Sequence, residues 1–176
     1  MASQILSKQD IGRLLDEIAC KVVEQHQDEG TIYVIGIHTR GYPLAKRLAQ
    51  RLKTLGKSVK IGALDITFYR DDLTMIDKKP VVKASKISPE IDDKVVLLVD
   101  DVIFTGRTVR AALCEIMDYG RPKRIELAVL IDRGGREVPI EATYVGKKVE
   151  VGRDYIVDVK LTEVDGTDGV WIFKRS

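Results

Sequence analysis

The chain has 176 residues, a formal net charge of +2 and 44% hydrophobic residues, which is the size and composition of one soluble globular domain with its own core. Its two cysteines, Cys20 and Cys114, stand far apart and form no CxxC pair, which argues against a disulfide scaffold and a zinc module. The longest aliphatic run, residues 95–99, is far shorter than a membrane span, and the first residues form no signal peptide. We therefore expect a cytoplasmic protein without membrane contact.

The first part of the chain alternates helix and strand patterns. Ser7 and Asp10 have the outline of a helix start, and the apolar residues after them keep helical spacing up to a break at Gly30. These residues are Ile11, Leu14, Leu15, Ile18, Ala19, Val22 and Val23. His26, near the end of this helix, is expected to face solvent. Residues 32–37 predict a buried strand, and a second helical stripe through Leu44, Leu48, Leu52 and Leu55 ends at Gly56.

The middle and the end of the chain continue this alternation after one interruption. Residues 70–90 are charged, contain Pro80 and Pro89 and show no helical stripe, so we expect a long lid loop there. The other expected elements are strands at 59–69, 95–99, 125–131, 143–145, 155–161 and 170–173 and a helix at 107–119. The pattern predicts a single α/β domain over residues 1–176, with a mostly parallel sheet flanked by helices.

The most informative stretch is LLVDDVIFTGRTV, residues 97–109. A buried strand delivers Asp100 and Asp101 at its carboxyl end, where ligands bind in open α/β sheets. A turn with Thr105 and Gly106 then enters a helix, whose free backbone N–H groups suit a phosphate. The carboxylates would repel phosphate but suit sugar hydroxyls, or a magnesium ion between those hydroxyls and another phosphate. Although the acids could merely end a strand before an ordinary turn, the whole pattern favours a phosphorylated ribose as ligand.

This stretch resembles the phosphoribosyl pyrophosphate (PRPP) motif of type I phosphoribosyltransferases. The wider chain is similar to one branch of them, the pyrimidine-operon attenuation regulators that are also uracil phosphoribosyltransferases. The segments that carry this closer resemblance are GIHTRG (36–41), DITFYRDDL (65–73), VRAA (109–112), DRGGREVPI (132–140) and YVGK (144–147). The resemblance implies the type I phosphoribosyltransferase fold, with a small hood and a mobile lid over about 70–90, and a homodimer or a higher homo-oligomer.

The resemblance also implies the substrate contacts. Thr39 and Arg40 contact the pyrophosphate, for which a planar guanidinium is well suited, and Arg70 reaches it from the lid. Asp100 and Asp101 hold the ribose diol and, indirectly, the Mg²⁺ bound to PRPP; with Arg40 they are the expected catalytic residues. The other expected PRPP contacts are Val102, Ile103, Phe104, Thr105, Gly106, Arg107 and Thr108. Uracil is expected beside Ile131, Asp132 and Arg133. His38 stands where these proteins commonly carry lysine, and no role is assigned to it.

The implied reaction is uracil plus PRPP giving UMP and pyrophosphate. Some relatives place a third acid in the motif to act on a purine base. Phe104 occupies the corresponding position here, which argues against a purine acceptor.

The same branch regulates pyrimidine operons by UMP-dependent binding to the messenger RNA leader. Arg136 and Lys147 match basic residues of its RNA-binding face. Acidic or neutral residues stand elsewhere on that face, at Glu17, Cys20, Gln25 and Glu141, and the two carboxylates would repel RNA. Two alternatives therefore stay open: an enzyme without RNA binding, and an RNA-binding regulator that only senses UMP and PRPP.

Overall fold

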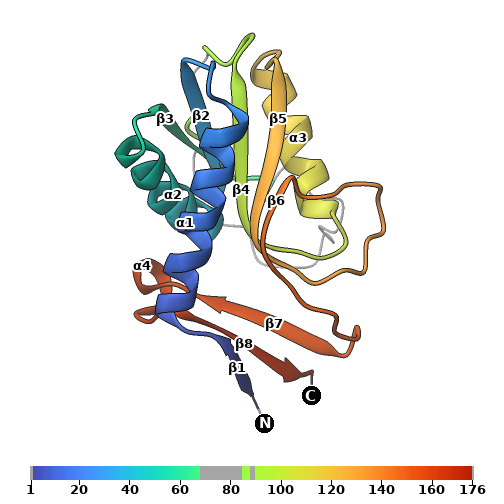
Figure 1. Ribbon diagram of the computed structural model, residues 1–176. Coiled ribbons are helices and arrows are strands. Elements are labelled where there is room, and N and C mark those ends of the chain that lie inside the picture. Colours follow the sequence, from blue (N-terminus) through green and yellow to red (C-terminus); the bar gives the residue numbers. More distant parts are fainter. Residues whose placement is uncertain (1, 68–84, 88–89, 176) are drawn as a thin grey trace.

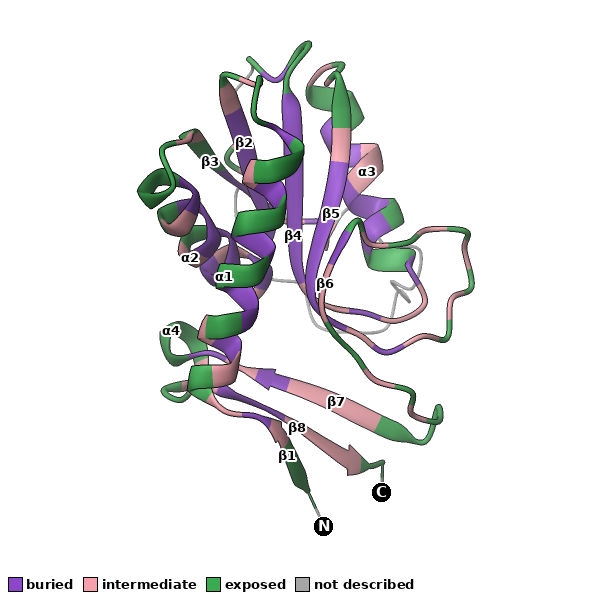
Figure 2. Ribbon diagram, in the orientation of Figure 1, coloured by how far each residue is buried: buried purple, intermediate pink, exposed green. Residues whose placement is uncertain are grey.

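A computed structural model describes residues 2–67, 85–87 and 90–175. Its largest unit is a five-stranded parallel sheet in the order β3-β2-β4-β5-β6 (Figure 1). The strands are β2 (Thr31–Ile37), β3 (Ser58–Leu64), β4 (Val95–Ile103), β5 (Arg124–Asp132) and β6 (Tyr144–Lys148). Helices cover both faces, which is why the central strands are apolar along nearly their whole length (Figure 2).

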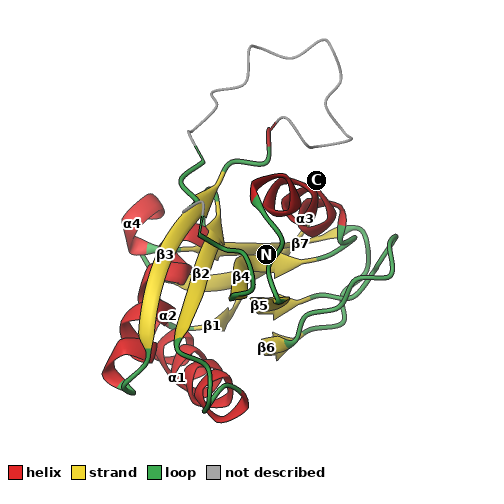
Figure 3. Cartoon of the chain, turned by 90° about the horizontal axis from the view of Figure 1, so that it is seen from above, coloured by secondary structure: helices red, strands yellow, loops and turns green. Residues whose placement is uncertain are grey.

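Successive residues of each strand point to opposite faces of this sheet. Val34 belongs to the core beneath α1 (Lys8–Gln25) and α2 (Gly41–Thr54), whereas its neighbour Ile35 belongs to the core beneath α3 (Arg107–Tyr119). The view from above shows α1 and α2 on one side of the strands and α3 on the other (Figure 3). Each helix therefore buries one apolar stripe, as its spacing in the sequence predicts.

A smaller antiparallel sheet, in the order β1-β8-β7, forms the hood. It contains β1 (Ser3–Leu6), β7 (Tyr155–Lys160) and β8 (Gly169–Lys174), and the short helix α4 (Thr162–Asp165) joins β7 to β8. Figure 1 shows the hood at one end of the large sheet, with both chain ends on it. The core beneath α1 and α2 continues into the hood, so the two sheets share apolar contacts.

The strand order creates a natural binding position between β2 and β4. The chain leaves β2 toward β3 on one side, and the later strands β4, β5 and β6 lie on the other. Connections at the carboxyl ends of β2 and β4 therefore diverge, leaving a crevice between the two strand ends. The functional residues expected after residues 37 and 99 are brought to this one edge.

The predicted α/β class, with its flanking helices and hood, is confirmed, and the structure corrects several details. Ser7 and Asp10 form a complete capping box: Asp10 N donates to Ser7 Oγ and Ser7 N donates to the Asp10 carboxylate. Helix α1 ends at Gln25, before Gly30. Strand β4 runs to Ile103 because its last residues pair with β5, so the two aspartates lie within the strand and not after it.

The segment expected as a lid lies mostly outside the described residues, and so do Arg70 and residues 68–69 of the strand expected at 59–69. Within the described part, β3 ends at Leu64. Lys86 pairs with Ala63 in an isolated antiparallel bridge. The elements not anticipated from the sequence are β1 and α4.

Candidate active site at the carboxyl ends of β2 and β4

A cavity of about 370 Å³ opens where β2 and β4 end. It is lined by Ile37, His38, Thr39, Arg40, Asp65, Ile66, Thr67, Asp100, Asp101, Val102 and Thr108. The cavity thus brings together residues from the loop after β2, from β4 and from the start of α3, which were predicted to act on one ligand. Asp65, Ile66 and Thr67, which follow β3, were not predicted as site residues.

The two aspartates form an acidic pair in this cavity, in which Asp100 is buried and Asp101 is partly buried. Asp100 is only 6% exposed, and its Oδ1 accepts a hydrogen bond from the backbone N–H of Asp101 at 2.9 Å. Burial, together with the charge of Asp101, raises the pKa of Asp100 well above its ordinary value. Burial also raises the pKa of Asp101, while the nearby Arg40 guanidinium opposes this increase. A ligand that supplies hydroxyl donors or positive charge would therefore stabilise the ionised form of these two carboxyl groups.

Helix α2 packs directly against the acidic pair. A side chain at Gly41 would place its Cβ 2.5 Å from the carbonyl oxygen of Val99 and 3.2 Å from the Cα of Asp100. Only glycine fits this position, because both neighbours are backbone atoms. The close approach brings the loop before α2, with Thr39 and Arg40, to the rim of the same cavity.

Arg40 supplies the positive charge of the site. It precedes the first residue of α2, and the peptide bond two residues before it, between His38 and Thr39, is cis. Its guanidinium donates to the carboxylate of Asp165 in α4, from Nη2 at 2.7 Å and from Nε at 3.1 Å. The hydrogen bonds to Asp165 raise the pKa of Arg40, and Asp101 adds to this increase. The side chain stays 32% exposed, so it can still meet a ligand.

The turn after β4 builds a second, smaller hollow of about 150 Å³. It is lined by Val102, Ile103, Phe104, Thr105, Gly106, Thr108 and Val109. Gly106 has a φ of +88°, and a Cβ there would lie 2.7 Å from Val138 Cγ2, so the turn requires glycine. Within the described residues no side chain caps the start of α3, and Arg107 N donates a long 3.3 Å hydrogen bond to Thr105 Oγ1. The first turn of α3 therefore offers N–H groups to an anion.

The three residues expected beside uracil lie at the end of β5 and line neither cavity. Ile131 is buried in the sheet. Asp132 accepts hydrogen bonds from Arg136 Nη2 at 2.7 Å and from Gly134 N at 2.9 Å. Although burial opposes it, these hydrogen bonds lower the pKa of Asp132. The charged side chain of Asp132 is thus already engaged within the protein.

Arg133 is engaged in the same way. It is 7% exposed, donates to the carbonyl oxygens of Tyr155 and Gly152 at 3.0 and 3.1 Å, and stacks 4.1 Å above the Phe104 ring. It joins the turn after β4 to the hood by packing on Phe104, which lines the smaller hollow, and by donating to Tyr155 of β7. Phe104 also packs closely against Gly135, where a Cβ would lie 2.4 Å from its ring.

The two residues expected to bind RNA differ in their surroundings. The Arg136 guanidinium is 20% exposed and donates to the carbonyl oxygens of Ile140 and Phe104 at 2.8 and 2.9 Å, besides its ion pair with Asp132. It holds the loop after β5 in place. Lys147 is exposed on β6, next to the exposed Lys148.

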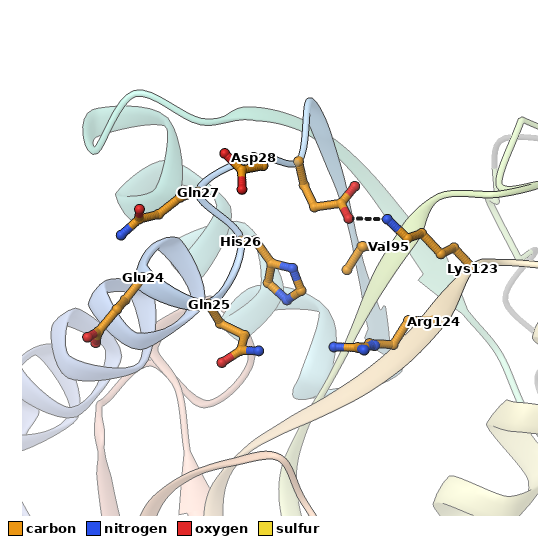
Figure 4. A pocket seen from close by; sticks show the side chains of 9 residues that line it. Glu24, Gln25, His26, Gln27, Asp28, Val95, Lys123 and Arg124 are labelled. Atoms are coloured by element: carbon orange, nitrogen blue, oxygen red, sulfur yellow. Dashed lines mark hydrogen bonds and ion pairs between the residues drawn. The ribbon is translucent and has the colours of Figure 1, made fainter.

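A separate cavity of about 340 Å³ lies at the end of the large sheet where β4 and β5 begin, and His26 is among the residues that line it (Figure 4). The surroundings of His26 differ from the prediction. His26 is 4% exposed, and its Nε2 lies 2.8 Å from Glu126 Oε2, which also accepts a hydrogen bond from Tyr144 Oη at 2.7 Å. The expectation that His26 faces solvent is therefore wrong. Its partner lies 100 residues away, so no local pattern could have revealed the pair.

In the described part of the chain, no cluster of three or more His, Cys, Asp or Glu side chains could hold a metal ion. Asp100 and Asp101 nevertheless supply carboxylate oxygens side by side in an open cavity, which are the ligands that Mg²⁺ prefers. The pair fits an ion that arrives bound to a phosphorylated substrate.

Comparisons with known proteins agree with this architecture. The family model of the phosphoribosyl transferase domain matches residues 1–165. The chain is 53% identical over 169 residues to the bifunctional protein PyrR of Alkaliphilus metalliredigens (strain QYMF), covering 96% of this chain and 93% of that protein. It is 52% identical over 175 residues to the bifunctional protein PyrR of Pelotomaculum thermopropionicum, covering 99% and 97%.

Two solved structures share the fold. The hypoxanthine phosphoribosyltransferase of Trypanosoma cruzi superposes with a TM-score of 0.75 at 16% identity, covering 99% of this chain and 97% of that chain. The hypoxanthine-guanine phosphoribosyltransferase of Bacillus anthracis gives a TM-score of 0.72 at 18% identity, covering 98% and 97%. At such low identity the similarity concerns the fold only.

Proposed function

Because the chain belongs to the phosphoribosyltransferase family, in the branch of the bifunctional PyrR proteins, we propose that it is a uracil phosphoribosyltransferase and a regulator of pyrimidine-operon transcription. It converts uracil and PRPP into UMP and pyrophosphate. The observation that carries the catalytic half is the cavity between β2 and β4, which Arg40 lines together with Asp100 and Asp101.

Each part of PRPP has a matching group in this site. The start of α3, with Thr105, Gly106, Arg107 and Thr108, receives the 5′-phosphate in the smaller hollow. Asp100 and Asp101 accept hydrogen bonds from the ribose hydroxyls. Thr39 and Arg40 hold the pyrophosphate in the larger cavity, which both residues line.

The chemistry is a substitution at the anomeric carbon. The bond from this carbon to the pyrophosphate oxygen breaks, the bond to N1 of uracil forms, and the N1 proton is lost. Positive charge develops on the ribose, which the carboxylates of Asp100 and Asp101 stabilise, while Arg40 stabilises the negative charge on the leaving pyrophosphate. Asp100 and Asp101 would hold Mg²⁺ indirectly, through PRPP, and the ion would supply positive charge that neutralises the phosphates. Arg70 from the lid is proposed to complete the pyrophosphate contacts.

The surroundings of the base favour uracil. The turn after β4 contains Phe104 and no acidic side chain that could exchange a proton with a purine ring. The Phe104 ring itself packs against Arg133 and Gly135. The side chains of Asp132 and Arg133 are engaged within the protein. We therefore expect backbone groups near Ile131 to read the edge of the pyrimidine.

The catalytic half is tested by measuring nucleotide formation from PRPP and Mg²⁺ with four bases in parallel: uracil, hypoxanthine, guanine and orotate. We expect UMP from uracil and no product from the other three. Nucleotide formation from a purine but not from uracil would overturn the substrate assignment. If no base gave a product, the proposal that the protein is a phosphoribosyltransferase would be wrong.

The regulatory half is binding of UMP-loaded protein to the leader of pyrimidine-operon messenger RNA. It is supported by the identity to PyrR proteins over nearly the whole chain and by the exposed Lys147 and Lys148. Gel-shift titration of a leader hairpin, with and without UMP, tests it against a scrambled hairpin. Equal binding to both hairpins would contradict the regulatory role and leave only the proposed enzymatic activity.

Residues 1–176 are proposed to act as one domain, which the core shared between the two sheets supports. We further propose a homodimer or a higher homo-oligomer that works in the cytoplasm. The exposed Leu55 and Met117 supply apolar surface for self-association, and light scattering after size-exclusion chromatography measures the assembly. In the described part of the chain, no helix is long and apolar enough to cross a membrane.

A further inference from the structure

Asp165 in the hood makes the best-formed contact to the proposed pyrophosphate-binding arginine. Its Oδ1 accepts from Arg40 Nη2 at 2.7 Å and its Oδ2 accepts from Arg40 Nε at 3.1 Å. The same Oδ2 also accepts from the backbone N–H of Leu161 at 2.8 Å. The carboxylate is therefore held by the backbone at the start of its own helix. It binds Nε and Nη2 of the guanidinium in a bidentate geometry, which restricts the orientation of the arginine side chain.

This grip leaves the other end of the guanidinium available. Within the described residues, Arg40 Nη1 has no hydrogen-bond partner, and Arg40 lines the larger cavity whereas Asp165 does not. Asp165 thus holds Arg40 from the side of the hood while Nη1 stays free for an anion. The hydrogen bonds from Arg40 lower the pKa of Asp165, so the carboxylate stays ionised near neutral pH.

A second arginine secures the segment that carries Asp165. Arg47, two helical turns after Arg40 on α2, binds Glu163 through Nε and Asp168 through Nη1, both at 2.8 Å. Arg40, just before α2, and Arg47, within it, therefore both bind α4 or the residues just after it. Only the Arg40 contact reaches the cavity, which makes the Arg47 contact a natural control.

We propose that Asp165 is a positioning residue that orients Arg40 for the pyrophosphate group of PRPP, so that the hood sets the geometry of the leaving-group site. The inference rests on the proposed function, in which Arg40 holds the pyrophosphate. A guanidinium already held in place loses less side-chain freedom when the substrate binds.

The test compares Asp165→Asn with Glu163→Gln, which makes the same carboxylate-to-amide change two residues away. For Asp165→Asn we expect the KM for PRPP to rise and kcat/KM for PRPP to fall, each by about tenfold, with the KM for uracil unchanged. Product inhibition by inorganic pyrophosphate should weaken to a similar extent. Glu163→Gln should leave all these constants within about twofold, and melting temperatures of both variants show whether each is folded.

A double-variant cycle shows whether Asp165 acts through Arg40. In an Arg40→Ala background, Asp165→Asn should cause no further change in the KM for PRPP. The positioning role is overturned if Asp165→Asn leaves the KM for PRPP unchanged, or if it tightens PRPP binding, because a tighter complex would mean that Asp165 competes with the substrate. If Arg40→Ala itself leaves PRPP and pyrophosphate binding intact, the assignment of Arg40 in the proposed function fails instead.

Discussion

At the scale of single residues, the site depends on two carboxylates, Asp100 and Asp101, whose ionised form is disfavoured by burial in the fold. Asp100 and Asp101 lie inside a strand whose other residues are apolar, and burial raises the pKa of both. A raised pKa means that the ionised carboxylates are less stable in the folded protein than in the unfolded chain. The protein thus gives up stability at the two positions where the ribose and its metal ion are proposed to bind.

The double substitution Asp100→Asn with Asp101→Asn should abolish most of the activity while keeping the shape of the site. The amides cannot stabilise positive charge on the ribose, so we expect a loss of about 2–4 kcal/mol of transition-state stabilisation. This loss corresponds to a roughly 30- to 1,000-fold fall in kcat/KM. Steady-state kinetics with varied PRPP measures the loss. A double variant with nearly the original activity would mean that the acidic pair is not part of the site.

Asp100→Asn alone should raise the thermal stability. The folded-state pKa of Asp100 lies above its ordinary value of 3.8, so its ionised form destabilises the fold at neutral pH, and this cost disappears as the pH falls below about 3.8. The melting temperature of the variant should exceed that of the natural protein at pH 7, and the difference should shrink on acidification. A lower melting temperature at pH 7 would show that the carboxylate is compensated by contacts other than those described.

At the scale of elements, the join between α2 and α4 ties the hood to the large sheet. Asp168 accepts two hydrogen bonds from Arg47, both at 2.8 Å, and its side chain is 2% exposed. These hydrogen bonds lower the pKa of Asp168 to about 2 from its ordinary 3.8. Because the folded pKa is depressed, the contribution to stability is complete above pH 3.8 and is lost as the pH falls toward 2.

Asp168→Asn should therefore lower the free energy of unfolding at pH 7 by about 1–2 kcal/mol. Glu163→Gln, which changes the more exposed partner of the same arginine, should cost less than about 1 kcal/mol. Urea unfolding at pH 7 measures both, and the Asp168→Asn difference should narrow between pH 4 and pH 2. Equal costs for the two variants would show that burial does not strengthen the Asp168 contact.

The elements also show how far the sequence predicts the fold. The three long helices follow from their apolar spacing, and α3 begins and ends where it was predicted, at Arg107 and Tyr119. The short elements β1 and α4 could not be predicted, because four residues carry too little periodicity and their stability comes from partners distant in sequence. The end of β4 was placed too early, since pairing with β5 overrides the low strand propensity of aspartate.

For the site, local motifs predicted Thr39, Arg40, Asp100, Asp101 and Thr108, and the fold brings them to one cavity. The contacts of these residues were not predictable. The partner of Arg40 lies 125 residues later in the chain, in the hood, and is joined to it only by the tertiary fold. Likewise, nothing near Arg136 in the sequence indicates that its guanidinium donates to the carbonyl oxygen of Phe104.

At the scale of the whole molecule, the small net charge of +2 leaves RNA binding to a few local groups. Lys147 and Lys148 are exposed on β6, whereas the donors of Arg136 are used within the protein. Glu141, also exposed, adds a negative charge to the segment before β6. We expect weak, salt-sensitive binding of a leader hairpin, strengthened by UMP, with each phosphate contact contributing about 0.7–0.9 to the slope of log K against log salt.

Glu141→Arg should tighten this binding and make it more salt-sensitive, because repulsion is replaced by attraction, while UMP synthesis stays nearly unchanged. Glu90→Arg is the matched control, since Glu90 is exposed, pairs with Lys60 of β3 at the edge of the large sheet farthest from β6, and undergoes the same change of charge. Gel shifts at two salt concentrations, with and without UMP, compare the two variants. Equal tightening by both would mean that the effect is not specific to the face that carries β6.

The pairing of β1 with β8 has a consequence for synthesis of the protein on the ribosome. Residues 3–6 are made before the large sheet, whereas their partners at 170–172 are made after every strand of that sheet. The parallel sheet can therefore assemble on a nascent chain whose hood is still missing. Until α4 has been made, Arg40 lacks the carboxylate of Asp165, so we expect competence for PRPP only after α4 has been synthesised.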